Sequence, residues 1–176
     1  MIALQDLWLD AWNFAAAAHR KQKLPGQDLP YLVHLGAVSM EVMVAHQKVR
    51  FLRPGLALQC ALLHDILEDT DTNETVIAMK FGPDVTAGVR ALTKETALKN
   101  EAMADSLRRI QLQPSEVWAV KLADRIANLG PPPARWTEAK IVSYRREAQG
   151  ILDALHQAHE PLASRLAQRI LDYPPS

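Results

Sequence analysis

The chain has 176 residues, and its 20 lysines and arginines balance its 20 aspartates and glutamates, so it lacks the overall positive field of a nonspecific nucleic-acid binder. This length fits one domain over residues 1–176, and the single cysteine, Cys60, excludes internal disulfides and zinc modules built on several cysteines. No run approaches the roughly 18 apolar residues of a membrane helix, and no secretory leader opens the chain, so we expect a cytoplasmic protein.

Apolar residues recur at helical spacing along most of the chain. The pattern predicts helices over residues 3–22, 31–47, 54–67, 72–81, 83–92, 96–111, 115–129, 137–158 and 161–171. Asp71 or Thr72 is the expected N-cap of the helix that ends near residue 81, and Ser115 is the expected N-cap of a later one. Because no stretch alternates as a strand does, we expect an all-α bundle of about eight to ten helices.

One segment joins ionisable side chains to an apolar helix, and it reads Leu63-His64-Asp65-Ile66-Leu67-Glu68-Asp69-Thr70. In a continuous helix, Glu68 lies one turn beyond His64, and Asp69 lies one turn beyond Asp65. Three carboxylates and an imidazole crowded at a helix end are unfavourable unless a cation or a chemical task compensates. Taken alone, the segment also fits a solvated helix end with His64 as a helix cap.

Two other segments add similar ligand chemistry. His34 lies where a loop meets the second predicted helix, and Asp124 lies between apolar residues later in the chain. Lys121, Asp124 and Asn128 share one helix face by their spacing. Imidazole nitrogens combined with carboxylate oxygens suit a divalent transition metal such as Mn²⁺, Fe²⁺ or Zn²⁺.

The order His…His-Asp…Asp resembles the HD phosphohydrolase superfamily, whose fold is all-helical. More narrowly, the chain resembles the hydrolase domain of the RelA/SpoT alarmone enzymes and the small alarmone hydrolases. The matching words lie between about residues 15 and 155 and are Pro30-Tyr31-x-x-His34, Leu63-His64-Asp65-x-x-Glu68-Asp69-Thr70, Phe81-Gly82-x-x-Val85, Leu92-Thr93-Lys94 and Val120-Lys121-Leu122-Ala123-Asp124-Arg125-x-x-Asn128-Leu129.

The resemblance implies roles for particular residues. It implies one divalent metal ion, Mn²⁺ by preference, with the ligands His34, His64, Asp65 and Asp124. Glu68 and Asp69 match the pair that positions and deprotonates the attacking water. The implied substrate contacts are Lys23, Lys121, Asn128 and Tyr144. A lysine at position 121 equally suits an ion pair with Glu68 or Asp69.

The implied reaction removes the 3′-pyrophosphate of ppGpp or pppGpp and gives GDP or GTP plus pyrophosphate. The partner is then a phosphorylated guanosine nucleotide, with no nucleic acid and no membrane, and the sequence predicts no particular oligomeric state. Family members commonly carry the motif Arg-Lys-Asp in the loop after the first helix. In this chain the corresponding residues 19–25 include basic side chains but lack that motif. Two alternatives therefore stay open: an HD phosphohydrolase acting on another nucleotide or phosphoester, and a metal-bound nucleotide sensor without catalysis.

Overall fold

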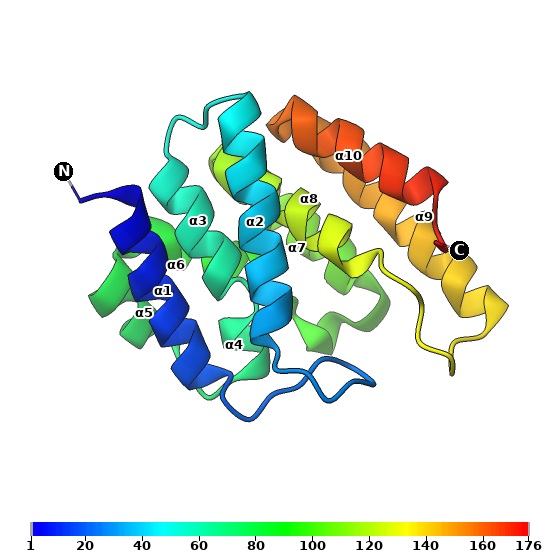
Figure 1. Cartoon of the computed structure of the whole chain (residues 1–176), viewed down its shortest axis with the longest axis horizontal. Helices are drawn as coiled ribbons and strands as arrows, with labels where there is room; N and C mark the ends of the chain where they lie inside the picture. The colour runs from blue at the N-terminus through cyan, green and yellow to red at the C-terminus, as the bar shows by residue number, and fades with distance from the viewer. Residues whose placement is uncertain (1, 176) are drawn as a thin grey trace.

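Helices form nearly all the regular structure of the computed structural model, which describes residues 2–175 (Figure 1). In chain order they are α1 (Leu4–Ala18), α2 (Leu32–Lys48), α3 (Pro54–Leu63), α4 (Ile66–Asp69), α5 (Glu74–Phe81), α6 (Pro83–Leu92), the 3-10 helix η1 (Thr96–Glu101), α7 (Ala102–Gln111), α8 (Ser115–Asn128), α9 (Glu138–Leu155), the 3-10 helix η2 (His156–Ala158) and α10 (Glu160–Leu171). Within the described residues, β-structure is limited to one isolated bridge between Lys23 and Pro30. The predicted all-α bundle is confirmed. No helix of this range is long and apolar enough to cross a membrane.

Three helices, α2, α3 and α8, pack against one another at the centre of the bundle (Figure 1). Helix α1 covers α3 on one side, and α9 and α10 cover α8 on the other. Seven of the ten residues of α3 are buried, and α8 buries most of its apolar residues. Burying a large aliphatic side chain contributes about 1.5–3 kcal/mol. Polar side chains carried by these central helices therefore stand on a rigid, well-packed support.

The predicted helix over residues 54–67 is interrupted, and the structure divides it into α3 and α4. His64 Nδ1 lies 2.8 Å from the carbonyl oxygen of Ala61. That carbonyl is the acceptor that the backbone N–H of Asp65 uses in a continuous helix. The imidazole bonds to this acceptor at the point where the helix is interrupted, Asp65 has φ −100° and ψ 1°, and a new helix begins at Ile66.

The first helix ends at Ala18 and not near residue 22, because the chain turns there into a closed loop. The backbone N–H of Gln22 donates to the carbonyl of His19 at 2.9 Å. At the other end of the loop, the backbone N–H of Tyr31 donates to the carbonyl of Gln22 at 3.0 Å. These two bonds form a neck that holds the end of α1 beside the start of α2.

Two predicted helix caps are wrong. The side chain of Asn73 caps α5 by accepting from the backbone N–H of Val76 at 3.1 Å, whereas Thr72 bonds to the hydroxyl of Thr70. Pro114 holds the N-cap position of α8, so Ser115 is the first residue of that helix and not its cap. The ends of two predicted helices, residues 96–101 and 156–158, are 3-10 turns.

Candidate active site

Three of the predicted metal ligands meet between the start of α2, the α3–α4 break and α8. The Nε2 atoms of His34 and His64 lie 3.3 Å apart. Asp124 Oδ1 lies 3.4 Å from His34 Nε2 and 3.7 Å from His64 Nε2. All three side chains are buried, and one ligand atom of each lies within 4.8 Å of the others. Two imidazoles and a carboxylate that converge in this way fit a divalent metal ion.

The backbone decides which nitrogen of His64 faces this cluster. Its Nδ1 donates to Ala61, so Nε2 points toward His34 and Asp124. Burial by itself lowers the pKa of His64, but the carboxylates of Asp65 and Asp124 outweigh it and raise the pKa to about 10. A metal ion and a proton therefore compete for the same nitrogen.

Asp65, the fourth predicted ligand, lies at the edge of the cluster. Its Oδ2 atom is 2.8 Å from His64 Nε2 and 3.7 Å from His34 Nε2, and it accepts a hydrogen bond from the Tyr31 hydroxyl. Burial disfavours the charged carboxylate, but His64 and the Tyr31 hydroxyl hold the pKa of Asp65 below its usual range. Burial and the Asp65 charge raise the pKa of Tyr31, which keeps the phenol protonated as a donor.

Lys121 and Asn128 contact the group of predicted metal ligands through Asp124. Lys121 Nζ donates to Asp124 Oδ2 at 2.9 Å, and Asn128 Nδ2 donates to Asp124 Oδ1 at 2.5 Å. Lys121 is buried, and its partner is Asp124, not Glu68 or Asp69. Burial disfavours ionised Asp124, but Lys121 and the two histidines outweigh it and hold the pKa of Asp124 well below its usual range. Lys121 and Asn128 thus orient a predicted ligand.

Glu68 and Asp69 line an open cavity of about 560 Å³ next to α4. Its walls also include cations and polar groups from the end of α1, and the full lining is Ala18, Arg20, Lys21, Gln22, Glu68, Asp69, Thr70 and Asp71. Glu68 Oε2 accepts from the backbone N–H of Lys94 at 3.1 Å, and Asp69 Oδ2 accepts from Gln22 Nε2 at 2.8 Å. The α3–α4 break separates His64 from Glu68, whereas Asp69 stays one helical turn beyond Asp65, because its backbone N–H donates to the Asp65 carbonyl at 2.9 Å. The cations of this cavity, Arg20 and Lys21, suit a phosphorylated ligand.

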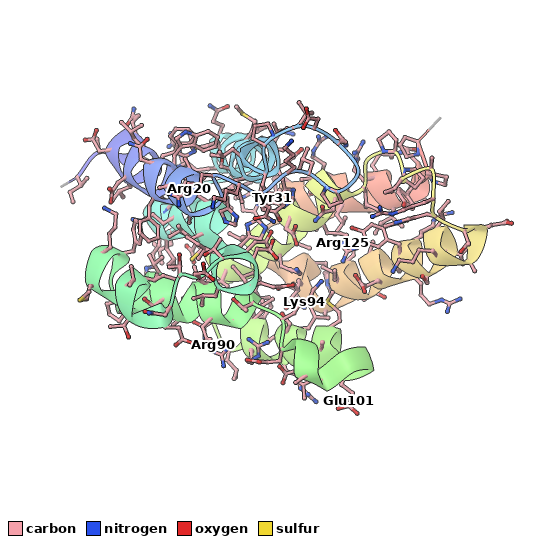
Figure 2. The ribbon with its side chains drawn as sticks, turned by 90° about the horizontal axis from the view of Figure 1, so that it is seen from below. Arg20, Tyr31, Arg90, Lys94, Glu101 and Arg125 are labelled. Carbon is pink, nitrogen blue, oxygen red and sulfur yellow. The ribbon has the colours of Figure 1, made fainter. Side chains whose placement is uncertain are left out.

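Two predicted substrate contacts lie elsewhere. Lys23 is largely exposed and pairs with Asp28 within the loop. Tyr144, on α9, stacks under the guanidinium of Arg125, whose Cζ lies 4.4 Å from the ring centroid. In the view of Figure 2, Arg20 and Tyr31 lie in the upper half of the molecule and Lys94 lies below them.

Sequence reasoning gave no role to two residues of the site, Tyr31 and Gln22. Tyr31 could have been found from its place three residues before His34, one turn away from a predicted ligand. Gln22 follows His19 at the same spacing, but nothing in the local sequence indicates its contact with Asp69.

Comparison with known proteins gives one matching family, and the HD domain matches residues 11–168. Two relatives are named guanosine-3′,5′-bis(diphosphate) 3′-pyrophosphohydrolase MESH1. The Drosophila melanogaster protein is 28% identical over 90% of each chain, and the Xenopus tropicalis protein is 30% identical over 94% of each chain. A larger relative, the Brucella melitensis GTP pyrophosphokinase rsh, is 36% identical over 68% of this chain and 16% of its own.

A solved structure shares the fold over almost its full length. It is described as a metazoan ortholog of SpoT that hydrolyses ppGpp. The TM-score is 0.82 at 27% sequence identity, and the match covers 96% of each chain.

Proposed function

This chain belongs to the HD domain family, and on that premise we propose that it is a metal-dependent phosphohydrolase that removes the 3′-pyrophosphate of ppGpp or pppGpp. The observation that carries the proposal is the buried group of His34, His64 and Asp124, together with a cavity lined by acids and cations. Two of those acids, Glu68 and Asp69, lie on α4, the helix that follows His64. The named activity of relatives that align with at least 90% of this chain supports the same reaction.

We assign the metal to His34, His64, Asp65 and Asp124, and we propose Mn²⁺ as the ion. When bound, a divalent ion of this kind lowers the pKa of a coordinated water and neutralises phosphate charge. The chain supplies the geometry. The Ala61 carbonyl orients His64, the Tyr31 hydroxyl holds Asp65, and Lys121 and Asn128 hold Asp124.

Glu68 and Asp69 then act as the pair that positions a water and takes its proton. The water oxygen bonds to the phosphorus that carries the 3′ oxygen of the nucleotide. The bond between that phosphorus and the 3′ oxygen breaks, and the 3′ oxygen leaves as a hydroxyl by taking up the proton that the carboxylate pair removed from the water. Arg20 and Lys21 line the same cavity and suit the remaining phosphate oxygens. Substrate contacts by Lys23, Lys121, Asn128 and Tyr144, and the cytoplasmic location, stay predictions.

The direct test is release of pyrophosphate from ppGpp with and without added Mn²⁺. Glu68→Gln and Asp69→Asn should each lower kcat by about 10²–10⁴-fold, the usual contribution of general acid–base catalysis. Asp172→Asn is the matched control, because Asp172 also accepts from a glutamine amide but lies on the exposed end of α10. A wild-type protein that binds Mn²⁺ and releases no pyrophosphate from ppGpp contradicts the proposal.

A second candidate is hydrolysis of a different phosphorylated nucleotide. The observation that favours it is the pairing of Lys23 with Asp28, which occupies a cation of the loop that follows α1. A panel of nucleoside polyphosphates and phosphoesters tests it, and a kcat/KM higher for another compound than for ppGpp selects this candidate.

A further inference from the structure

We propose that His19 and Gln22 form a directional hydrogen-bonded chain that positions the Asp69 carboxylate. His19 lies just after α1, Gln22 lies at the neck of the loop, and Asp69 ends α4. The inference rests on the proposed function, since it concerns a carboxylate to which that function assigns proton transfer. His19 and Gln22 are positioning residues in this scheme, and neither needs to touch the substrate.

The geometry fixes the direction of the chain. Gln22 Nε2 lies 2.8 Å from Asp69 Oδ2, and His19 Nδ1 lies 2.5 Å from Gln22 Oε1. An ionised carboxylate only accepts hydrogen bonds, so the amide NH₂ of Gln22 faces Asp69. The amide oxygen must then face His19, and His19 Nδ1 carries the proton that it donates.

The backbone holds Gln22 at the neck of the loop. Its N–H donates to the His19 carbonyl at 2.9 Å, and its own carbonyl accepts from the N–H of Tyr31 at 3.0 Å. The two neck residues reach two carboxylates one helical turn apart, since Gln22 bonds to Asp69 and Tyr31 bonds to Asp65. The same neck therefore sets a proposed metal ligand and a proposed catalytic carboxylate.

His19 has a property that core packing alone does not explain. Only 1% of its surface is exposed, and its Nε2 atom has no hydrogen-bond partner among the described residues. A buried, unpartnered polar atom is destabilising, and a phenylalanine could pack against Tyr31, whose ring centroid is 5.1 Å away, without that penalty. The imidazole is thus explained by the donor at Nδ1.

Gln22 is also suited to this task by its lack of charge. The groups that face the cavity include the cations Arg20 and Lys21 and the acids Glu68 and Asp71. An ion pair with either cation would stabilise the charged carboxylate of Asp69 and make it a weaker base. A neutral amide anchored by His19 fixes the orientation of the carboxylate and leaves it free to accept a proton.

The first test removes the donor without adding charge. Gln22→Met should lower kcat by about 10–100-fold, the range for groups that orient a catalytic centre from outside it. We expect KM, Mn²⁺ affinity and the thermal midpoint to stay near their wild-type values. His19→Phe should lower kcat in the same direction. Gln168→Met is the matched control, because Gln168 makes the same kind of bond to Asp172 at 2.9 Å on the surface.

The second test changes the charge and separates positioning from packing. In Gln22→Glu the new carboxylate repels Asp69 at neutral pH, so kcat should fall further than in Gln22→Met. At lower pH the introduced glutamic acid becomes protonated and can donate to Asp69 as the amide does. The ratio of variant to wild-type kcat should therefore rise as the pH falls from 8 to 5.5, a trend that a purely structural role does not produce.

The outcomes distinguish this inference from the proposed function. An active wild type with kcat unchanged in Gln22→Met, or a Gln22→Glu ratio that is independent of pH, overturns the positioning role alone. A wild type inactive on ppGpp but active on another phosphoester overturns the proposed substrate, and the same variants are then compared on that compound. Inactivity on every compound overturns both.

Discussion

Both ends of α2 carry a buried histidine, and the two surroundings give them opposite chemistry. Near the N-terminal end, His34 Nε2 lies 3.3 Å from His64 Nε2 and 3.4 Å from Asp124 Oδ1. Near the C-terminal end, His46 stacks on Phe51 with ring centroids 5.8 Å apart and accepts from its backbone N–H at 3.0 Å. A buried imidazole is thus a ligand candidate at one end and a packed hydrogen-bond acceptor at the other.

The neighbouring charges explain the difference. At the first end, His34 faces His64, which follows α3, and the carboxylates of Asp65 and Asp124 overcome burial and raise the pKa of His64 to about 10. At the second end, burial lowers the pKa of His46, and the nearby Arg50 and His159 lower it further. A site that favours a proton also favours a metal cation, whereas a site that repels a proton repels the metal.

The largest expected effect comes from removing the Asp124 charge that faces His34 near the N-terminal end of α2. Asp124→Asn keeps the side-chain volume but loses an anionic ligand, so we expect activity to fall by roughly 1,000-fold, more than the 10–100-fold typical of groups outside the ligand set. Metal content after dialysis and the rate of pyrophosphate release measure the effect. His46→Gln is the control and should retain both. One equivalent of tightly held metal in Asp124→Asn would contradict the assignment.

The next effect concerns stability. Lys121→Met leaves Asp124 buried without its cation, and breaking a buried pair costs about 3–5 kcal/mol. Urea unfolding of the metal-free protein measures the loss, and Mn²⁺ should restore part of it by supplying positive charge. Lys80→Met removes a more exposed pair with Asp10 and should cost at most about 1 kcal/mol. Equal losses in the two variants would show that the buried pair is not special.

A smaller effect is expected at the second end of α2. His46→Leu removes the acceptor for the Phe51 N–H, which costs about 1–3 kcal/mol at pH 8. The pKa of His46 is lower in the folded protein than the ordinary value of 6.5, so the unfolded chain binds more protons at acidic pH. Its contribution is therefore present above pH 6.5 and is lost as the pH falls through the folded pKa. Urea unfolding between pH 8 and 5 should show a flatter pH dependence in the variant, and identical slopes would refute this account.

The smallest effect is expected where α2 meets α10. Arg165 Nε and Nη2 each lie 2.6 Å from the Glu41 carboxylate, but the arginine is half exposed. Arg165→Ala should cost about 0.2–1 kcal/mol in urea unfolding and leave hydrolysis unchanged, since exposed ion pairs contribute little. A loss well above that range would mean that this contact holds the bundle together.

Much of the fold followed from local sequence. Pro54 and Pro83 begin the helices that were predicted from them, and the all-α class follows from helical periodicity. The α3–α4 break did not follow, because it depends on the His64 ring competing for a backbone acceptor. Residue type alone does not reveal which acceptor a side chain will take.

The candidate site divides in the same way. His34, His64 and Asp124 were predicted as ligands from the resemblance to the HD phosphohydrolase superfamily, and the structure brings them together. The partners of the site were not predictable, since Gln22 and Asp69 are 47 residues apart and Tyr31 and Asp65 are 34 residues apart. The ion-pair partner of Lys121 was also not predictable. Its spacing permitted the observed pair with Asp124, but the sequence equally allowed a pair with Glu68 or Asp69.

By itself, the sequence excluded a nonspecific nucleic-acid binder through its neutral charge, determined the fold class through its helical periodicity, and supplied the ligand-forming residues. Tertiary structure alone decided how closely the predicted histidines and carboxylates approach one another, and which neutral groups hold those carboxylates in place. The physical reason is that helix propensity and amphipathicity act between residues within a few turns. Burial and electrostatic attraction depend on neighbours in space, which only the packing of α2 against α3 and α8 provides.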